Sequence, residues 1–499
     1  MWRVLVSIYE RVESCVRVEG NLTDWFPVET GVRQGCVLSP LLYAFFINGL
    51  VRELNELGVG IHIEGRERKL CCLLYADDIV MMCENKKDLQ SMLDLVARYA
   101  EKWRFELNSR KSEVVIFGRT RAPRNIVWRM GANIIKQVSF YKYLGIELTR
   151  TLNYKKYLTR IITKARRNMI QTLAMGIKGG YMTPRLGNVM WTNHTGRRYG
   201  GKREVKEIDK LQHEMGKRIL ICSKKTSKEV VRGELGWERQ IARRDEMRLR
   251  YFARIVRMKE GRVAKQIYKA SRRRLVREEQ EENKETTDTW CFYTRKLMYE
   301  LNLEEEWEEE KVGGEEDWND LVRKKIHERE QEEWRRVCLS KSKLRTYVIL
   351  KRVLRVDPYL SSRQIRGIPE LVKLRGGTNR LRIEQGRYRK EAVEDRICLC
   401  CERKEVEDEK HFVLFCDLHK EERKELWNEF ERITGVLKTS MTDEERLNAL
   451  IGDGFQPLVD EDKQSNTSVK YQELIRCVMK YVIRCMTKRK AILERLLEG

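Results

Sequence analysis

The chain has 499 residues, 41% of them hydrophobic, so it suits about two to four domains with packed cores and excludes a single small domain. Its formal net charge of +25 and pI near 9.5 favour a partner with a phosphate backbone, although a merely soluble basic protein would share them. No segment is predicted to be a signal peptide or a membrane span. We therefore expect the fourteen cysteines to be thiols or metal ligands in a reducing compartment, which excludes a disulfide framework.

The first informative segment is the loop at residues 31–42, which contains the tripeptide Arg33-Gln34-Gly35. Gly35 lets a backbone approach a ligand closely, while Arg33 and Gln34 bring a cation and an amide to the same loop. A phosphate or base edge at this loop would meet charge, amide and the N-terminus of the following helix together. The segment therefore predicts a ligand-binding loop.

Two apolar runs, Leu70 to Leu74 and Ile79 to Met82, flank the segment Tyr75-Ala76-Asp77-Asp78. Apolar strands joined by a tight acidic turn predict a hairpin, because Asp tolerates turn geometry. Such a hairpin holds the two carboxylates side by side, as polymerases do to bind the divalent ions that flank a phosphoryl transfer. On these four residues alone, a surface hairpin whose aspartates only solvate the turn is an equal alternative.

Helices are expected on both sides of this hairpin. Tyr43 to Leu54 is an apolar helix candidate, with Pro40 in its first turn and Ser39 in the capping position. Lys87 to Trp103 carries apolar residues three and four positions apart, which predicts one amphipathic helix. After it we expect a strand at Val114 to Phe117.

Together with the later segment Phe140 to Gly145, these segments resemble, in order and spacing, the later palm motifs of a reverse transcriptase from a non-LTR (LINE-type) retrotransposon. The resemblance covers about residues 1–150 and implies a partial polymerase palm, an antiparallel sheet with helices. It implies that Asp77 and Asp78 are catalytic and bind Mg²⁺ at a two-metal site. It also implies an RNA template, a DNA primer or target, dNTPs, and an intracellular location in the nucleus or a cytoplasmic ribonucleoprotein.

The resemblance implies further roles around the acidic turn. Lys111 falls where the family often has a basic residue near the leaving pyrophosphate, although Lys111 or the adjacent Arg110 can equally be a solvated turn residue. Tyr143-Leu144-Gly145 resembles the primer-grip hairpin, with ordinary hairpin packing as the equal alternative. The residues expected against the incoming nucleotide and template are Arg33, Gln34, Gly35 and Tyr75.

One departure from the family concerns the acidic residues before the loop. The family supplies a further metal-binding carboxylate from a strand that precedes everything resembling Trp2 to Leu5. Residues 15–19 and 25–29 alternate like a hairpin with Asp24 in or near its turn, and no acid there lies on a strand like the missing one. We therefore expect an incomplete copy that lacks the first catalytic carboxylate and is a poor polymerase or none.

The middle of the chain predicts helices. Residues 151–260 are expected to form a thumb-like helical region that begins with a helix at Lys155 to Leu173, and Met182 to Gly201 is expected to be a loop. Glu234-Leu235-Gly236-Trp237 follows a pattern of the same retrotransposon proteins, and its simpler interpretation is a core anchor between helices. We expect residues 261–345 to be a charged helical linker, partly disordered.

A second constellation lies at Cys398, Cys401, His411 and Cys416. The Cys-x2-Cys spacing lets two sulfurs face one ion, and a third thiolate with an imidazole completes the donor set of a tetrahedral structural zinc site. The alternatives are a buried thiol cluster with the histidine on a strand, or Cys400 in place of one of the first two sulfurs. His419 is a less favoured substitute for His411.

Basic and aromatic residues flank this constellation, among them Arg387, Tyr388 and Arg389, which can stack on bases and meet phosphates. Residues 375–425 resemble the C-terminal cysteine–histidine segment of invertebrate non-LTR elements, which implies one structural Zn²⁺ and binding of element RNA or target DNA. We expect a zinc-binding region at residues 346–440 and C-terminal helices at 441–499.

The sequence thus predicts an α+β protein: a partial palm over residues 1–150, a mostly helical thumb and linker, and a small C-terminal zinc module. The predicted function is that of an RNA-directed DNA polymerase of a non-LTR retrotransposon. The alternative is a non-catalytic nucleic-acid-binding remnant or domesticated protein. The missing carboxylate favours the remnant, whereas the intact acidic turn and Arg-Gln-Gly loop favour recent descent from an active enzyme.

Overall fold

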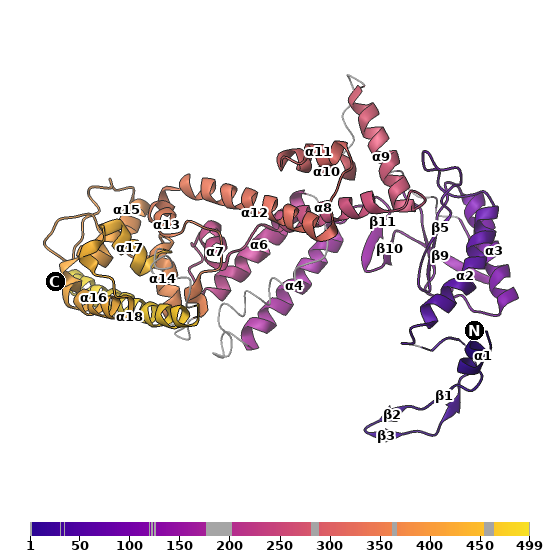
Figure 1. Cartoon of the computed structure of the whole chain (residues 1–499), viewed down its shortest axis with the longest axis horizontal. Coiled ribbons are helices and arrows are strands. Elements are labelled where there is room, and N and C mark those ends of the chain that lie inside the picture. Colours follow the sequence, from indigo (N-terminus) through magenta and orange to yellow (C-terminus); the bar gives the residue numbers. More distant parts are fainter. Residues whose placement is uncertain are drawn as a thin grey trace. The chain divides into compact units, whose positions relative to one another are not determined.

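The computed structural model describes residues 2–29, 31–33, 35–118, 120, 123, 126–175, 202–280, 289–361, 367–453 and 464–498. The chain forms two compact units. The first unit contains residues 1–153 and 259–285, and the second contains residues 154–258 and 286–499 (Figure 1). The loop expected at Met182 to Gly201 lies outside the described residues.

In the first unit, α2 (Ser39–Glu56) and α3 (Lys86–Trp103) cover the hairpin of β5 (Cys72–Tyr75) and β6 (Asp78–Met81). Apolar side chains of both helices form one core with the two cysteines at the start of the hairpin. The core explains why the hairpin is fixed, since a two-stranded ribbon alone is marginally stable. Its buried members are Ile47, Leu50, Leu54, Cys71, Cys72, Met92, Leu95, Val96 and Tyr99.

Local sequence accounts for the ends of these helices. Asn85 caps α3 by accepting a hydrogen bond from the backbone N–H of Asp88 at 2.9 Å. The predicted helices over 43–54 and 87–103 are confirmed. The predicted cap at Ser39 is wrong: Ser39 lies inside α2 and its hydroxyl donates to the carbonyl of Arg33 at 2.7 Å.

The N-terminal segment forms a ladder of very short strands after α1 (Trp2–Tyr9). Its turn differs from the expected one, because Val18 pairs with Asn21 and so places Glu19-Gly20 at the tip, away from Asp24. Gly20, at φ 92°, adopts the left-handed backbone that this tight turn needs. The strands are β1 (Glu13–Ser14) with β4 (Phe26–Pro27), and β2 (Arg17–Val18) with β3 (Asn21–Leu22).

Five further strands complete the first unit. The central strand β9 (Asn133–Val138) pairs in parallel with β7 (Glu113–Val115) and antiparallel with β8 (Trp128–Met130). The hairpin of β10 (Phe140–Tyr143) and β11 (Ile146–Thr149) follows. The expected strand at 114–117 is confirmed in part, since it ends at Val115.

Helix α9 (Val263–Gln280) belongs to the first unit although it lies far along the chain. Arg273 donates to the carbonyl of Glu64 at 2.9 Å, and Arg277 binds the Glu64 carboxylate at 2.5 Å. These contacts attach α9 to the first unit, and the chain from residue 286 onward belongs to the second unit.

The second unit is helical. Short 3₁₀ and π turns join some of its helices, and apolar side chains of most of these helices form one large core. The helices are α4 (Lys155–Met175), α6 (Lys202–Ile219), α7 (Lys228–Leu235), α8 (Gln240–Arg257), α10 (Trp290–Glu300), α11 (Glu304–Glu308), α12 (Glu315–Leu339), α13 (Arg345–Leu350), α14 (Ile368–Arg375), α15 (Arg382–Arg389), α16 (Lys420–Thr434), α17 (Asp443–Ile451) and α18 (Gln464–Glu498).

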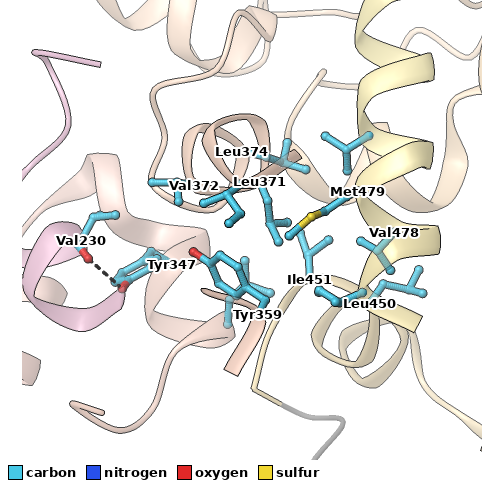
Figure 2. Packing of buried hydrophobic residues seen from close by; sticks show 14 of the residues in the cluster. Val230, Tyr347, Tyr359, Leu371, Val372, Leu374, Leu450, Ile451, Val478 and Met479 are labelled. Atoms are coloured by element: carbon cyan, nitrogen blue, oxygen red, sulfur yellow. Dashed lines mark hydrogen bonds between the residues drawn. The ribbon is translucent and has the colours of Figure 1, made fainter. Parts of the chain in front are cut away.

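The core of the second unit joins segments that are distant in sequence. Figure 2 shows Val230 of α7, Tyr347 of α13, Leu371 of α14 and Met479 of α18 in this core. The hydroxyl of Tyr347 is satisfied by the carbonyl of Val230 at 3.4 Å, so the phenol is buried without an orphaned polar group. The C-terminal helices are therefore part of the same fold as α7.

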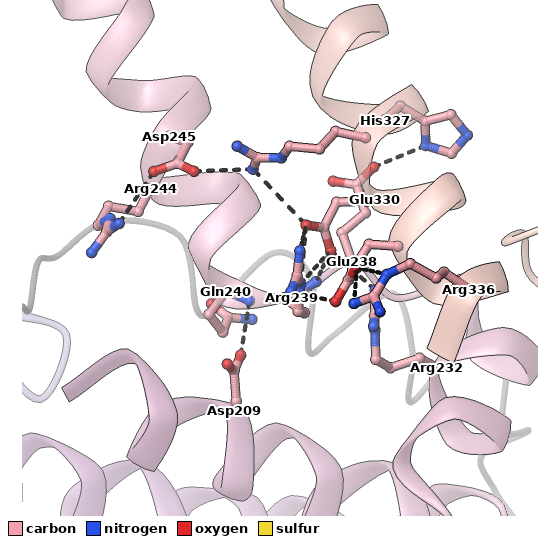
Figure 3. Close-up of polar contacts among 12 residues, drawn as sticks. Asp209, Arg232, Glu238, Arg239, Gln240, Arg244, Asp245, His327, Glu330 and Arg336 are labelled. Carbon is pink, nitrogen blue, oxygen red and sulfur yellow. Dashed lines mark hydrogen bonds and ion pairs between the residues drawn. The ribbon is translucent and has the colours of Figure 1, made fainter. Parts of the chain in front are cut away.

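A buried ionic cluster connects α8 with α12 (Figure 3). The carboxylate of Glu330, with no exposed surface, binds Arg232 at 3.0 Å and Arg239 at 2.6 Å, and it accepts the backbone N–H of Arg239 at 3.1 Å. Burial alone raises the pKa of Glu330, but the hydrogen bonds and charges of the two arginines hold it below its usual value. Glu330 is thus an ionised residue within the fold.

The segment Glu234-Leu235-Gly236-Trp237 is a structural anchor, which agrees with the simpler interpretation. Gly236 ends α7 at φ 63°, and a Cβ there would lie 2.4 Å from the backbone nitrogen of Val356. Glu234 has no exposed surface; its carboxylate contacts the guanidinium of Arg375, whose Nε lies 3.4 Å away, and accepts from Tyr359. These contacts make the segment part of the packing between α7 and the residues around 356–375.

Within residues 261–345, where the sequence predicts a charged helical linker, α12 has one buried face. This buried face carries Trp318, Val322, Ile326, Trp334 and Cys338. Of these residues, Trp334 and Cys338 belong to the large apolar core of the second unit. Because most other residues of α12 are charged, the spacing of these apolar residues is not evident from the sequence. In the described ranges, none of the helices has both the length and the apolar composition that crossing a lipid bilayer requires.

Candidate active site and metal centre

The acidic turn lies at the tip of the β5–β6 hairpin, as the sequence predicts. Tyr75 pairs with Asp78, so Ala76 and Asp77 are the two central residues, and Ala76 has φ 51° as a tight hairpin turn requires. Tyr75 is 62% exposed, and Asp77 and Asp78 are exposed. The apolar strands behind the turn are packed, so the two carboxylates are presented to solvent on a fixed support.

The negative charges of Asp77 and Asp78 raise the pKa values of different tyrosines. Asp77 and burial together raise the pKa of Tyr43 on α2, with burial the larger cause. Burial is also the main cause of the raised pKa values of Tyr141 and Tyr143 on β10, to which the negative charge of Asp78 adds. The tip of the hairpin therefore lies within electrostatic reach of Tyr43 on α2 and of Tyr141 and Tyr143 on β10. Nothing in the sequence marked Tyr43 or Tyr141 as neighbours of the acidic turn.

Hydrogen bonds of Arg33 connect the loop before α2 to α1 and to the first residue of α2. Arg33 donates to the carbonyl of Ile8 at 2.9 Å, and its own carbonyl accepts from Ser39. Gly35 has φ 83°, a left-handed conformation that favours glycine. Gln34 lies outside the described residues.

Lys111 and the β10–β11 turn lie close to each other. The backbone carbonyl of Lys111 accepts from the hydroxyl of Tyr141 at 3.4 Å, and the lysine is exposed at the start of β7. Tyr143 pairs with Ile146, so Leu144 (φ 45°) and Gly145 (φ 80°) form a two-residue turn. The backbone of Lys111 thus lies next to Tyr141 of β10, and Tyr141 and Tyr143 lie within electrostatic reach of Asp78.

The fit of the acidic turn to a divalent ion is partial. Carboxylate oxygens are suitable ligands for Mg²⁺. Among the residues that the structure describes, no third Asp, Glu, His or Cys lies near enough to join Asp77 and Asp78 in a metal-binding group. The turn supplies two ligands, and a two-metal site needs more.

The cysteine–histidine constellation is brought together by a hairpin and a π-helical turn. Cys398 lies beside the bridge between Ile397 and Val406, and its N–H donates to the carbonyl of Glu405 at 2.9 Å. His411 begins the π-helical turn His411–Phe415, in which the N–H of Cys416 donates to the carbonyl of His411 at 2.8 Å. His411 is therefore on a helical turn, and the alternative that placed it on a strand is wrong.

The donor atoms of Cys398, Cys401, His411 and Cys416 all lie within 4.8 Å of one another. The sulfurs of Cys398 and Cys416 are 3.9 Å apart, and Nε2 of His411 lies 3.5 Å from the sulfur of Cys401. Three sulfurs and one imidazole nitrogen fit the donor set of a structural zinc ion. His419 is fully buried against Phe412 and does not belong to this group.

Two acidic residues that the sequence did not single out support this group. Glu405 lies 2.9 Å from Nδ1 of His411, which leaves Nε2 to face the sulfurs. Glu407 is buried and pairs with Arg489 of α18 at 2.5 Å. A second possible group consists of Cys398, Cys400 and Glu407, so Cys400 is an alternative ligand in the structure as well.

Comparison with known proteins identifies the first unit. Residues 3–148 match the family "Reverse transcriptase (RNA-dependent DNA polymerase)", which confirms the resemblance to reverse transcriptases. The "RNA-directed DNA polymerase from mobile element jockey" of Drosophila melanogaster is 29% identical over 168 residues, which cover 32% of this chain and 18% of that protein. The "Probable RNA-directed DNA polymerase from transposon BS" of the same organism is 30% identical over 175 residues, covering 34% of this chain and 19% of that protein.

A third relative is the "Retrovirus-related Pol polyprotein from type-1 retrotransposable element R2" of Nasonia vitripennis, which is 26% identical over 155 residues, 29% of this chain and 15% of that protein. The matched segment therefore spans less than a fifth of the length of each of these relatives.

Proposed function

We propose, from the reverse transcriptase domain at residues 3–148, that this chain acts in RNA-directed DNA synthesis by a non-LTR retrotransposon. One observation carries the proposal: the turn of a packed hairpin exposes the carboxylates of Asp77 and Asp78, within electrostatic reach of Tyr43 on α2 and Tyr141 on β10. In this role Asp77 and Asp78 hold Mg²⁺, which stabilises the attacking and leaving oxygens of the phosphoryl transfer.

We give the surrounding residues the roles that the resemblance to reverse transcriptases implies. Arg33, Gln34, Gly35 and Tyr75 contact the nucleotide and template, and Lys111 lies toward the leaving pyrophosphate. The turn Tyr143-Leu144-Gly145 holds the primer end. Its support is the pairing of β10 with β11 and the proximity of Tyr143 to the charge of Asp78.

The second unit contributes binding in this proposal. The helices within residues 151–260 would act as a thumb-like region. Cys398, Cys401, His411 and Cys416 would hold one structural Zn²⁺, which would stabilise the fold around them. Such a site has four protein ligands and no open position, so it organises a surface for RNA or DNA.

A second candidate function is nucleic-acid binding without polymerisation. It is favoured by the absence, in the described part of the chain, of a third ligand beside Asp77 and Asp78. The net charge of +25 supports binding in both candidates.

Replacement of Asp77 by asparagine separates catalysis from binding. We expect Mg²⁺-dependent extension of a DNA primer on an RNA template to fall by about a hundredfold or more, because a metal ligand is lost. Affinity for the primed template in EDTA should be unchanged, since it rests on basic side chains. Primer extension and fluorescence anisotropy on the same preparation measure the two quantities.

The matched control for this variant is Asp24→Asn, which removes an exposed acid in the same unit. It should leave extension unchanged. Equal loss of extension and binding in Asp77→Asn would contradict the metal assignment. Absence of extension by the unaltered chain, with binding intact, would favour the second candidate function.

A further inference from the structure

An exposed aromatic ring on α15 lies between cations from distant parts of the chain. Tyr388 is 56% exposed. The guanidinium carbon of Arg387 and the Nζ of Lys225 each lie 4.6 Å from the centroid of its ring. Because Lys225 belongs to the loop between α6 and α7, this arrangement arises only in the folded second unit.

Two more lysines bind the backbone of the loop that carries Lys225. Lys343 donates from Nζ to the carbonyl of Lys225 at 2.9 Å, and Lys217 donates from Nζ to the carbonyl of Lys224. Burial is the main cause of the lowered pKa of Lys343, and the positive charges of Arg387, Lys217 and Lys225 lower it further. Arg387, Lys217 and Lys225 therefore each lie close enough to Lys343 to repel its charge.

Acidic residues offset this repulsion only in part. Glu384 pairs with Arg387 at 2.8 Å, but it also pairs with Arg345 at 3.2 Å, so its charge is shared. Glu384 raises the pKa of Lys343, yet that pKa stays below its usual value. A fold that holds like charges around an exposed ring gains stability when an anion binds there.

A purely structural cation–π contact is the simpler interpretation of Tyr388. It would account for one cation over the ring. It would not account for the convergence of two lysines from the 217–225 segment with Lys343 from the 3₁₀ turn Ser342–Leu344. Basic side chains around an aromatic ring are instead the composition of sites that bind single-stranded nucleic acid.

We propose that Tyr388, Lys217, Lys225, Lys343 and Arg387 form a binding site for single-stranded nucleic acid. An unpaired base stacks on Tyr388 in place of Nζ of Lys225, and the flexible lysine turns to a flanking phosphate. The exchange is favourable because base–aromatic stacking is stronger than an exposed lysine–aromatic contact. The site contains none of the polymerase or cysteine–histidine residues, and its occupation requires no polymerisation.

The test uses the full chain and a fluorescein-labelled twelve-nucleotide oligouridine, with the corresponding DNA strand and a blunt RNA duplex as comparisons. Tyr388→Ala should weaken oligouridine binding by about tenfold, as loss of one stacked base does, whereas Tyr388→Phe should bind normally. Duplex binding should not change, because a paired base cannot stack on the ring. Circular dichroism checks that each variant is folded.

The matched control is Tyr299→Ala. Tyr299 is also exposed (47%) and has Arg295 over its ring at 5.7 Å, but its hydroxyl bonds to Glu308 in an acidic neighbourhood. This variant should bind oligouridine normally. Lys225→Gln should weaken single strand and duplex alike and reduce the salt dependence by about one phosphate contact.

The results separate the possible ligands. Equal effects of Tyr388→Ala on oligouridine and on the DNA strand would support a site that reads base and phosphate, and an effect on RNA alone would support a site that also reads the 2′-hydroxyl. Unchanged single-strand binding, or equal loss for single strand and duplex, would overturn the proposal. Neither outcome bears on Asp77, so failure here is distinct from failure of the proposed polymerase role.

Discussion

Replacement of Cys401 by serine is expected to lower the zinc content of the purified protein from about one ion per chain to near none. The four donor atoms lie within 4.8 Å of one another, and three of the ligands, Cys398, His411 and Cys416, are buried. Loss of one thiolate leaves an incomplete tetrahedral set. Because structural zinc sites contribute on the order of 10 kcal/mol to folding of small modules, this is the largest effect that we predict.

The structural consequence should extend beyond the ligands. The hydroxyl of Tyr481 on α18 donates to the carbonyl of Val413 at 3.0 Å, and Glu407 pairs with Arg489 of the same helix. Loss of zinc should therefore expose residues 395–418 and α18 to proteolysis together. Atomic absorption measures the ion, and limited proteolysis with mass spectrometry locates the exposed segments.

The adjacent thiol provides the matched control. Cys400→Ser should retain zinc, because Cys400 is not one of the four clustered ligands. If Cys400→Ser lost zinc while Cys401→Ser kept it, the ion would instead use the group of Cys398, Cys400 and Glu407. Glu405→Gln should keep the ion but weaken its binding by about tenfold or more, because Glu405 orients His411.

Replacement of Glu330 by alanine is expected to destabilise the second unit by about 3–5 kcal/mol. The change leaves Arg232 and Arg239 without the buried carboxylate that binds both of them (Figure 3). The side chain of Arg232 is only 13% exposed, so water cannot replace the lost partner fully. Urea unfolding followed by tryptophan fluorescence should show a lower midpoint, because Trp318 and Trp334 lie on the same helix.

Glu333 offers a control one helical turn away. Its side chain is 29% exposed and pairs with Arg336 at 2.7 Å, so Glu333→Ala should cost less than about 1 kcal/mol. Similar unfolding midpoints for the two variants would contradict the assignment of Glu330 as the ion that links α12 to Arg232 of α7 and to Arg239 at the N-cap of α8.

The sequence predicted the local parts of the first unit well because their signals are short-range. An acidic dipeptide between two apolar runs specifies a hairpin, and the spacing of apolar residues from Lys87 to Trp103 specifies α3. The spacing of Cys398, Cys401, His411 and Cys416 likewise predicted which donor atoms meet. In each case the residues that matter are close in sequence.

The parts that could not be predicted depend on distant contacts. The return of α9 to the first unit rests on the ion pairs of Arg273 and Arg277 with Glu64, and no periodic pattern signals such a pairing. The charged surface of α12 concealed the buried stripe that includes Trp334. The neighbourhood of Tyr388 likewise arises from a loop more than a hundred residues earlier in the chain.

The central claim is that Asp77 and Asp78 hold a divalent ion beside a primed template. Iron-mediated cleavage tests it most directly: Fe²⁺ with ascorbate replaces Mg²⁺ and cuts the polypeptide near its binding site, whether or not synthesis occurs. We predict cuts around residues 75–79 in the presence of primed template, retained in Asp24→Asn and lost when Asp77 and Asp78 are both replaced by asparagine. Cuts that persist in the double variant, or their absence from the unaltered chain, would contradict the claim.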